Sequence, residues 1–160
     1  MKLGAVIGTM ALAAFFPGPV LAQARTDATV IVPTDPRQAA EQDRLGYASA
    51  VIAGDFVFLS GVIAWRQTPD EPLAAAYERA FRQMGTALEK AGAGWSDVVD
   101  MTSYHTDPNG QIEALAAVKK RFIEAPHPAW TAIGVAGLLG ERGITEIKLT
   151  AYRAGVKKAG

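Results

Sequence analysis

The sequence predicts an α+β fold, in which a mixed β-sheet carries two helices on one of its faces. Short β-branched or alternating apolar runs occur towards both ends of the chain, and tight turns join some of them into pairs. Between them, two longer segments have apolar residues every three or four positions, as amphipathic helices do. The resulting order of strand, hairpin, helix, strand, helix, strand and strand favours two packed layers. A length of 160 residues suits one domain, which we place at 25–160.

Three strands are predicted in the first part of this domain. The run 28–32 is short and β-branched, and the following segment 33–46, rich in Pro, Asp and Gln, is predicted to be a loop. Two apolar runs within 47–64 flank the pair Gly54-Asp55, whose residue types suit positive φ, so these runs are predicted to form a hairpin. The second arm is apolar on both faces, which favours a central place in the sheet.

The first helix is predicted to begin at Thr68. Thr68 can cap it, Pro69 suits the first helical position, and Glu71 stands three residues after the cap. Gly92 marks its end. The residues expected to face the core follow a spacing of three to four: Leu73, Tyr77, Phe81, Met84, Leu88 and Ala91.

One more strand and a second helix follow, and two further strands close the chain. Residues 96–107 alternate as a strand, and Asp107 opens a helix that Pro126 stops. Segments 129–139 and 145–153 are predicted to be strands, joined by the tight connection GERG.

The first 24 residues have the layout of a secretory signal peptide. Lys2 gives a short positive region, residues 3–16 are apolar but too short to span a membrane comfortably, and small residues follow at Ala22 and Ala24. We therefore expect cleavage after Ala22 or Ala24, a secreted or periplasmic protein, and no association with the membrane after cleavage. An uncleaved anchor or an ordinary buried helix is the alternative for this segment.

The composition excludes several classes of function. Sixteen Lys and Arg balance sixteen Asp and Glu, so we expect no nucleic-acid partner. The chain has no cysteine, which rules out a thiol nucleophile, a disulfide and every zinc site built on cysteine. His105 and His127 are too few for a histidine-rich metal site, and no metal or other cofactor is predicted. On its strand, His105 is expected to be a core or interface group rather than a base.

The last predicted strand carries the most informative side chains. Glu146 and Lys148 are two positions apart, so they lie on one face of that strand. The preceding strand places Trp130, Ala132 and Gly134 on one of its own faces. If the two faces coincide, a carboxylate, an ammonium group and an aromatic ring line a surface floored by small residues, which suits a small-molecule site. The alternative is an ordinary polar sheet face, or a subunit interface with a Glu–Lys pair.

Four segments in one order resemble the Rid family, the YjgF-type reactive-intermediate deaminases. They are residues 46–61, 80–107, 128–138 and 146–152. The resemblance implies a mixed sheet backed by two helices, assembled as a homotrimer with ligand clefts between subunits. It also implies that the protein hydrolyses small imines and enamines to keto acids and ammonia.

The same resemblance assigns roles to particular residues. Tyr47 matches a tyrosine of the family's cleft, and Glu146 matches the glutamate that positions or activates water. Gly61 and Ala132 match positions that offer backbone contacts. Trp130 stands where the family has an arginine that binds the substrate carboxylate. An indole offers one neutral N–H and no charge, so it cannot do the work of a guanidinium fork.

Three interpretations follow from this substitution. The protein is a divergent hydrolase for a more apolar substrate, with Trp130 as a stacking wall; or a non-catalytic module that binds small ligands or protects proteins; or a protein in which Lys148 supplies the lost cation. For Lys148, an ion pair with Glu146 is the alternative to contact with an anionic ligand. A ribonuclease role fits poorly, because the chain is neutral and has no basic stripe.

Overall fold

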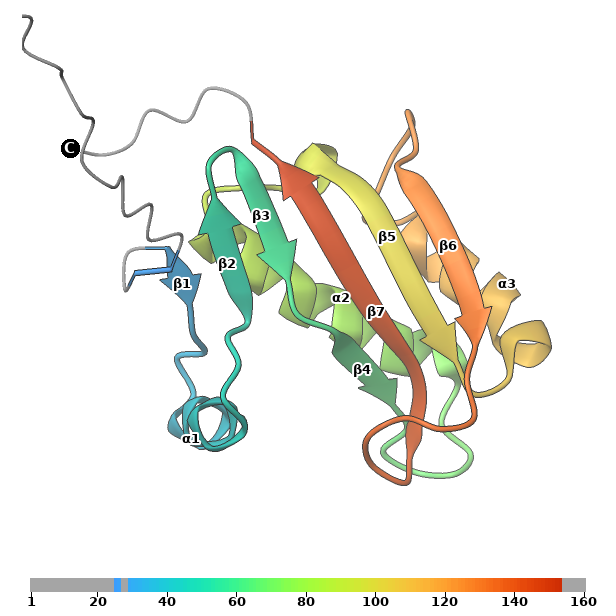
Figure 1. Cartoon of the computed structure of the whole chain (residues 1–160). Coiled ribbons are helices and arrows are strands. Elements are labelled where there is room, and N and C mark those ends of the chain that lie inside the picture. The colour runs from blue at the N-terminus through green and yellow to red at the C-terminus, as the bar shows by residue number, and fades with distance from the viewer. Residues whose placement is uncertain (1–24, 27–28, 154–160) are drawn as a thin grey trace, which may run out of the picture.

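The computed structural model describes residues 25–26 and 29–153 (Figure 1). The predicted signal peptide, with its cleavage sites at Ala22 and Ala24, therefore lies outside the described residues. No helix within the described ranges is long and apolar enough to cross a membrane.

Within those ranges, seven strands form one mixed sheet. In spatial order, six of them are β1 (Val30–Ile31), β2 (Ala50–Ala53), β3 (Phe56–Leu59), β7 (Gly143–Tyr152), β5 (Val98–His105) and β6 (Ala129–Gly134). The seventh, β4 (Val62–Trp65), pairs with the first half of β7. β5 and β6 are parallel and the remaining pairings are antiparallel, so the predicted mixed sheet is confirmed.

Two helices cover one face of this sheet, as predicted. α2 (Leu73–Lys90) and α3 (Pro108–Lys119) lie behind the strands in Figure 1, and the opposite face stays open. A further helix, α1 (Pro36–Leu45), lies beyond the ends of β1 and β2. A short 3-10 turn (Trp95–Asp97) leads into β5.

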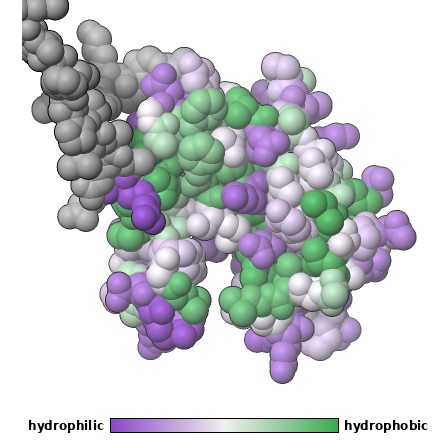
Figure 2. All heavy atoms as spheres, viewed as in Figure 1, coloured by the Kyte–Doolittle hydropathy of each residue, from purple (hydrophilic) through white to green (hydrophobic). Residues whose placement is uncertain are grey.

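The core lies between α2, α3 and the covered face of the sheet. The residues predicted to face the core from the first helix are buried, except that Leu73 is half-buried. The sheet contributes fully buried side chains that include Val57, Leu59, Met101, Ile147 and Leu149. On the open face, Phe56 stacks on Phe58 and packs against Tyr152, and all three are exposed. Figure 2 shows this open face as apolar patches interrupted by polar groups.

The predicted hairpin is present, but its second arm is split. Gly54 has a φ of 63° at the turn between β2 and β3, and β3 is central, as expected. The predicted arm then breaks at Ser60 and Gly61, so that β3 and β4 pair with different parts of β7. In the break, the Ser60 N–H donates to Ser49 O over 2.9 Å. We call Ser60 and Gly61 the strand break.

The predicted loop 33–46 is wrong over most of its length, because it contains α1. Asp35 caps this helix by accepting from two backbone N–H groups of its first turn, at 3.0 and 2.9 Å. Pro36 occupies the first position, and Gly46 ends the helix in the left-handed region with a φ of 72°. These start and stop signals stand in the sequence, but the helix has too few apolar residues to show a periodic stripe.

The first long helix begins later than predicted. α2 starts at Leu73 after Pro72, not at Thr68, and the Glu71 N–H closes a separate turn by donating to Thr68 O over 3.2 Å. The cause is Pro72, which disfavours helical backbone in the residue before it. The Glu71 carboxylate instead accepts from the Arg79 guanidinium, which lowers the pKa of Glu71 to about 2.

The second long helix begins where predicted. The Asp107 side chain accepts from the Gly110 N–H over 3.2 Å, and α3 ends at Lys119, well before Pro126. The last two predicted strands are present as β6 and β7, but they are not neighbours, because β5 lies between them. Their connection therefore passes from one side of β5 to the other.

Candidate functional site

The predicted glutamate lies on the open face of the sheet beside the strand break. Glu146 is in register with Ile63 of β4 and Tyr104 of β5, so these three side chains project to the same face. Gly61, within the break, lies against the Glu146 carboxylate, and a Cβ on Gly61 would overlap Glu146 Oε1. Glycine is needed here for close approach rather than for an unusual φ.

A shallow cavity of about 600 Å³ opens around this pair, and we call it the Glu146 cavity. Glu146 and Lys148 provide its charged groups, and Tyr104 adds a phenol. Its larger apolar lining residues are Val51, Phe58, Leu59, Val135 and Leu138. Small-molecule sites combine apolar walls with a few polar groups that orient the ligand, and this cavity offers both. Tyr104 was not predicted as a site residue. The sequence held a signal for it, because neighbouring residues of a strand face opposite sides and His105 was expected to face the core.

Lys148 shares the open face with Glu146, as predicted, and is exposed. It is in register with Thr102 of β5. The ion pairs among the described residues include none between Lys148 and Glu146. The interpretation of Lys148 as an ion-pair partner of Glu146 is therefore wrong in this structure, and its ammonium group lines the cavity without a bound carboxylate.

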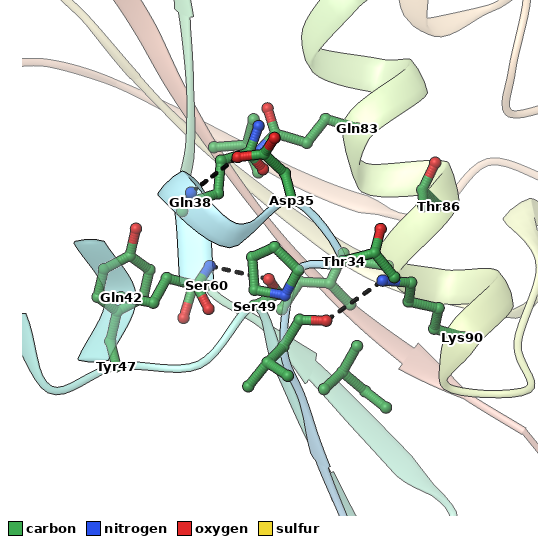
Figure 3. Close-up of a pocket in the computed structure, with 17 residues that line it drawn as sticks. Thr34, Asp35, Gln38, Gln42, Tyr47, Ser49, Ser60, Gln83, Thr86 and Lys90 are labelled. Carbon is green, nitrogen blue, oxygen red and sulfur yellow. Dashed lines mark hydrogen bonds between the residues drawn. The ribbon is translucent and has the colours of Figure 1, made fainter. Parts of the chain in front are cut away.

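Tyr47 lies on the other side of the strand break. It follows the Gly46 cap of α1, and its N–H donates to Gln42 O over 3.0 Å, which fixes the exit from the helix. Its side chain, 45% exposed, lines a second cavity of about 280 Å³ between α1 and α2 (Figure 3). The two cavities share Leu59–Gly61 as a wall. Tyr47 thus borders the same break as Glu146 without lining the Glu146 cavity.

The structure places Trp130 and Ala132 on the opposite face from Glu146. In the parallel pairing of β5 and β6, Trp130 is in register with buried Met101 and Ala132 with buried Ser103, so both side chains point to the helical layer. The predicted common face with Glu146 and Lys148 is therefore wrong. The cause is the position of β5, which separates β6 from β7 and sets the faces of both.

Trp130 packs as part of the covered layer. Its Nε1 donates to Ser103 Oγ over 2.9 Å, and its ring contacts the hydrophobic core. Lys119 of α3 lies over the indole, with Nζ 4.2 Å from the ring centroid, a cation–π distance. Lys119 is only 6% exposed, and burial lowers the pKa of its ammonium group.

His105 forms a buried polar network beneath the sheet. Its Nε2 lies 2.8 Å from Ser103 Oγ, and its Nδ1 lies 3.2 Å from Thr145 Oγ1. Thr145 in turn bonds to Tyr77 of α2 at 2.9 Å. His105 is fully buried, and this burial lowers the pKa of its imidazole. The prediction that His105 is a core group is confirmed.

The described residues contain no cluster of three or more His, Asp or Glu side chains that could hold a metal ion. The chemistry available at the Glu146 cavity is thus that of one carboxylate, one ammonium group, one phenol, the backbone of the strand break and the Ser60 hydroxyl, which donates to Ala48 O over 2.6 Å.

Comparison with known proteins identifies the family. The model of the endoribonuclease L-PSP family matches residues 38–153. The chain belongs to this family, also called YjgF, RutC or Rid. The resemblance found in the sequence is thereby confirmed, and so is the predicted fold class.

Individual relatives of this L-PSP family member support the same family and fold. The RutC family protein YjgH of Escherichia coli K12 is 38% identical over 97 residues, which cover 59% of this chain and 74% of YjgH. A protein of Dermatophagoides farinae named 2-iminobutanoate/2-iminopropanoate deaminase is 34% identical over 96 residues, or 58% of this chain and 74% of that protein. The crystal structure of Rv2704 from Mycobacterium tuberculosis has a TM-score of 0.67 at 26% identity, covering 78% of this chain and 98% of Rv2704.

Proposed function

We propose that the protein binds small imine or enamine metabolites in the Glu146 cavity and hydrolyses them to keto compounds and ammonia. The observation that carries this proposal is the Glu146 carboxylate, held against Gly61 in a cavity lined by both apolar and polar groups. The relative named 2-iminobutanoate/2-iminopropanoate deaminase supports the same reaction class for this chain.

In this proposal Glu146 acts first as a base and then as an acid. Water adds its oxygen to the carbon of a protonated imine, Glu146 takes the released proton, and the C=N electron pair moves to nitrogen. Glu146 then returns the proton to that nitrogen and the C–N bond breaks. The oxygen forms C=O, its proton passes to solvent, and ammonia leaves. An enamine joins this path once its carbon is protonated to give the imine.

Lys148 is our candidate for binding the substrate carboxylate. It is the only Lys or Arg among the lining residues of the cavity, and it has no ion-pair partner among the described residues. It stands two residues from Glu146, roughly 6.5–7 Å along an extended strand. Trp130, at the family's arginine position, packs under the sheet and does not line this cavity.

We further propose that a homotrimer of the chain completes the cleft. β6 has one strand neighbour in the sheet, and most of its residues are exposed, so this edge is available to a second copy. In such an assembly, β6 of one copy borders the Glu146 cavity of the next. The exposed backbone of Ala132 would then contribute to a neighbouring site, and Tyr47 would border it, whereas the Trp130 side chain stays in the covered layer.

An assay with freshly generated 2-iminobutanoate tests hydrolysis. We expect the wild type to accelerate ammonia release, and Glu146→Gln to lose about 100- to 10,000-fold of that acceleration, as removal of a general base does. Glu89→Gln, an exposed position on α2, is the matched control. No acceleration by the well-folded wild type would contradict the hydrolysis proposal.

Trp130 in place of arginine favours a second candidate, a small-ligand-binding or protein-protective module without catalysis. Binding of 2-oxobutanoate separates the two when no turnover is found. Saturable binding that Lys148→Met abolishes and the exposed control Lys120→Met retains would support the binding module. Although the family is named for an endoribonuclease, we do not propose RNA cleavage for this chain. The cavity carries one ammonium group and one carboxylate, and the chain has no net charge.

A further inference from the structure

The second cavity is separate from the Glu146 cavity. It lies between α1, α2 and the end of β1, and neither Glu146 nor Lys148 lines it (Figure 3). Its volume of about 280 Å³ is at the lower end of ligand pockets, which run from roughly 300 to 1,000 Å³.

The floor of this cavity contains a polar group whose bonding is incomplete. Gln42 of α1 is only 7% exposed, and its Nε2 donates to Ser49 Oγ over 2.9 Å. Gln42 Oε1 is buried and has no hydrogen-bond partner. Exchanging the amide oxygen and nitrogen does not change this, because one of the two atoms is left without a partner in either orientation. A buried polar group without a partner destabilises the fold, and a ligand that pairs with it removes that cost.

The mouth of the cavity is polar and largely uncharged. Thr34 and Gln38 come from the start of α1, and Gln83 and Thr86 come from α2 (Figure 3). The two charged lining residues already have partners: the Asp35 carboxylate caps α1, and Lys90 Nζ donates to Val32 O over 3.2 Å. The cavity therefore favours a neutral ligand over an anion or a cation.

The rest of the lining suits an apolar body. It is formed by Ile31, Val32, Pro33, Leu59, Val62 and Ala87. A ligand that fits has one hydrogen-bonding end for the floor and one apolar end for these walls.

We propose that this cavity is a binding site for a neutral carboxamide. The floor offers the Gln42 carbonyl as an acceptor and the Ser49 hydroxyl proton as a donor, and a carboxamide presents the complementary N–H and C=O side by side. Turning the terminal amide of Gln42 toward the cavity that it already lines brings the carbonyl into reach; this exchanges the Nε2–Ser49 bond for bonds to the ligand and frees the Ser49 hydroxyl to donate to it. This site does not depend on hydrolysis at Glu146.

Benzamide is the probe. Benzoate is its control, because it has a similar shape but carries a negative charge and has no N–H donor. Both are titrated into isotope-labelled wild-type protein, and NMR shifts are followed. We expect benzamide to cause saturable shifts at the Gln42 side-chain amide and at Ala87, with benzoate at least about ten-fold weaker there, which is about 1.4 kcal/mol. Absence of saturable shifts at these residues, or equal binding of benzoate, would overturn the proposal.

A pair of variants tests the floor. Gln42→Met keeps the length of the side chain and removes its hydrogen bonds, and we expect benzamide binding to weaken at least about ten-fold. Gln67→Met, at an exposed position outside the cavity, receives the same change and should bind as the wild type does. Unchanged binding by folded Gln42→Met would reject the site. If that variant does not fold, the location of the wild-type shifts decides alone.

Discussion

The carboxylate of Glu146 lies against the backbone of Gly61 at the point where the sheet loses its regular pairing. β3 pairs with residues 150–152 of β7 and β4 with residues 143–147, so residues 148 and 149 lie opposite the strand break. The break leaves space on the open face of the sheet, and the Glu146 carboxylate occupies it. Any residue larger than glycine at position 61 would place its Cβ where the carboxylate lies.

Replacing Gly61 by alanine tests this relationship. The group that a Cβ would meet is the far end of a flexible side chain, so Glu146 can move aside and we expect little change in melting temperature. The displaced carboxylate no longer holds water in place, and a misplacement of this size costs about 100-fold in turnover. Turnover of 2-iminobutanoate and melting temperature are measured on one preparation. Gly94→Ala, where the nearest atom to a Cβ lies 3.9 Å away, is the control, and wild-type turnover in Gly61→Ala would count against the site.

Trp130→Arg tests the position of the indole. If residue 130 lined an anion-binding cleft of its own chain, arginine would be tolerated there. The structure instead places it beside buried Lys119, so a guanidinium group would meet a second cation. We expect a loss of about 2–4 kcal/mol in the free energy of unfolding. Adding Lys119→Met should recover part of it. Denaturant unfolding measures both, and an unchanged midpoint in Trp130→Arg would show that the indole lies elsewhere.

The buried imidazole predicts how stability depends on pH. Because burial lowers the pKa of His105 in the folded state, the unfolded chain binds the proton more readily. Stability is then fully present above the unfolded pKa near 6.5 and falls as pH drops through the folded pKa, by at most about 1.4 kcal/mol per pH unit. We expect His105→Gln to flatten this slope between pH 7.5 and 5. The exposed His127→Gln variant should retain it; equal slopes in the two variants would contradict the assignment.

Export and processing form a separate prediction. Expression of the full chain in a Gram-negative host should give a periplasmic protein whose first residue is Gln23 or Arg25, in line with the small residues at Ala22 and Ala24. Fractionation and intact-mass measurement read this directly. Retention of Met1 in the membrane fraction would instead support an uncleaved anchor.

The sequence predicted the fold well where one physical signal dominated. The apolar stripe that includes Tyr77, Phe81 and Met84 identified α2 and its core face, and the Asp107 cap identified the start of α3. α1 was missed because hydrophobic periodicity cannot detect a polar helix. Only its capping residues, Asp35 and Gly46, indicate this helix in the sequence.

The site was predicted less completely, because faces depend on strand order. Alternation along β7 correctly placed Glu146 and Lys148 together. Whether Trp130 joins them depends on which strand separates β6 from β7, and no local pattern contains that information. The break at Gly61 was hidden for a similar reason, since an apolar run reads as one strand whether or not its pairing is continuous.

The hydrogen bond from Trp130 to Ser103 also fixes the register in which the edge strand β6 pairs with β5. β6 has a strand on one side only, and its small, exposed residues give it little packing to fix its alignment. A shift by one residue would turn the indole out to the open face and remove this donor from the buried Ser103 hydroxyl, which would keep only its contact with His105; the lost hydrogen bond is worth about 0.5–1.5 kcal/mol before any packing is counted. One indole N–H thereby stabilises a single pairing register of a strand whose other residues would allow several.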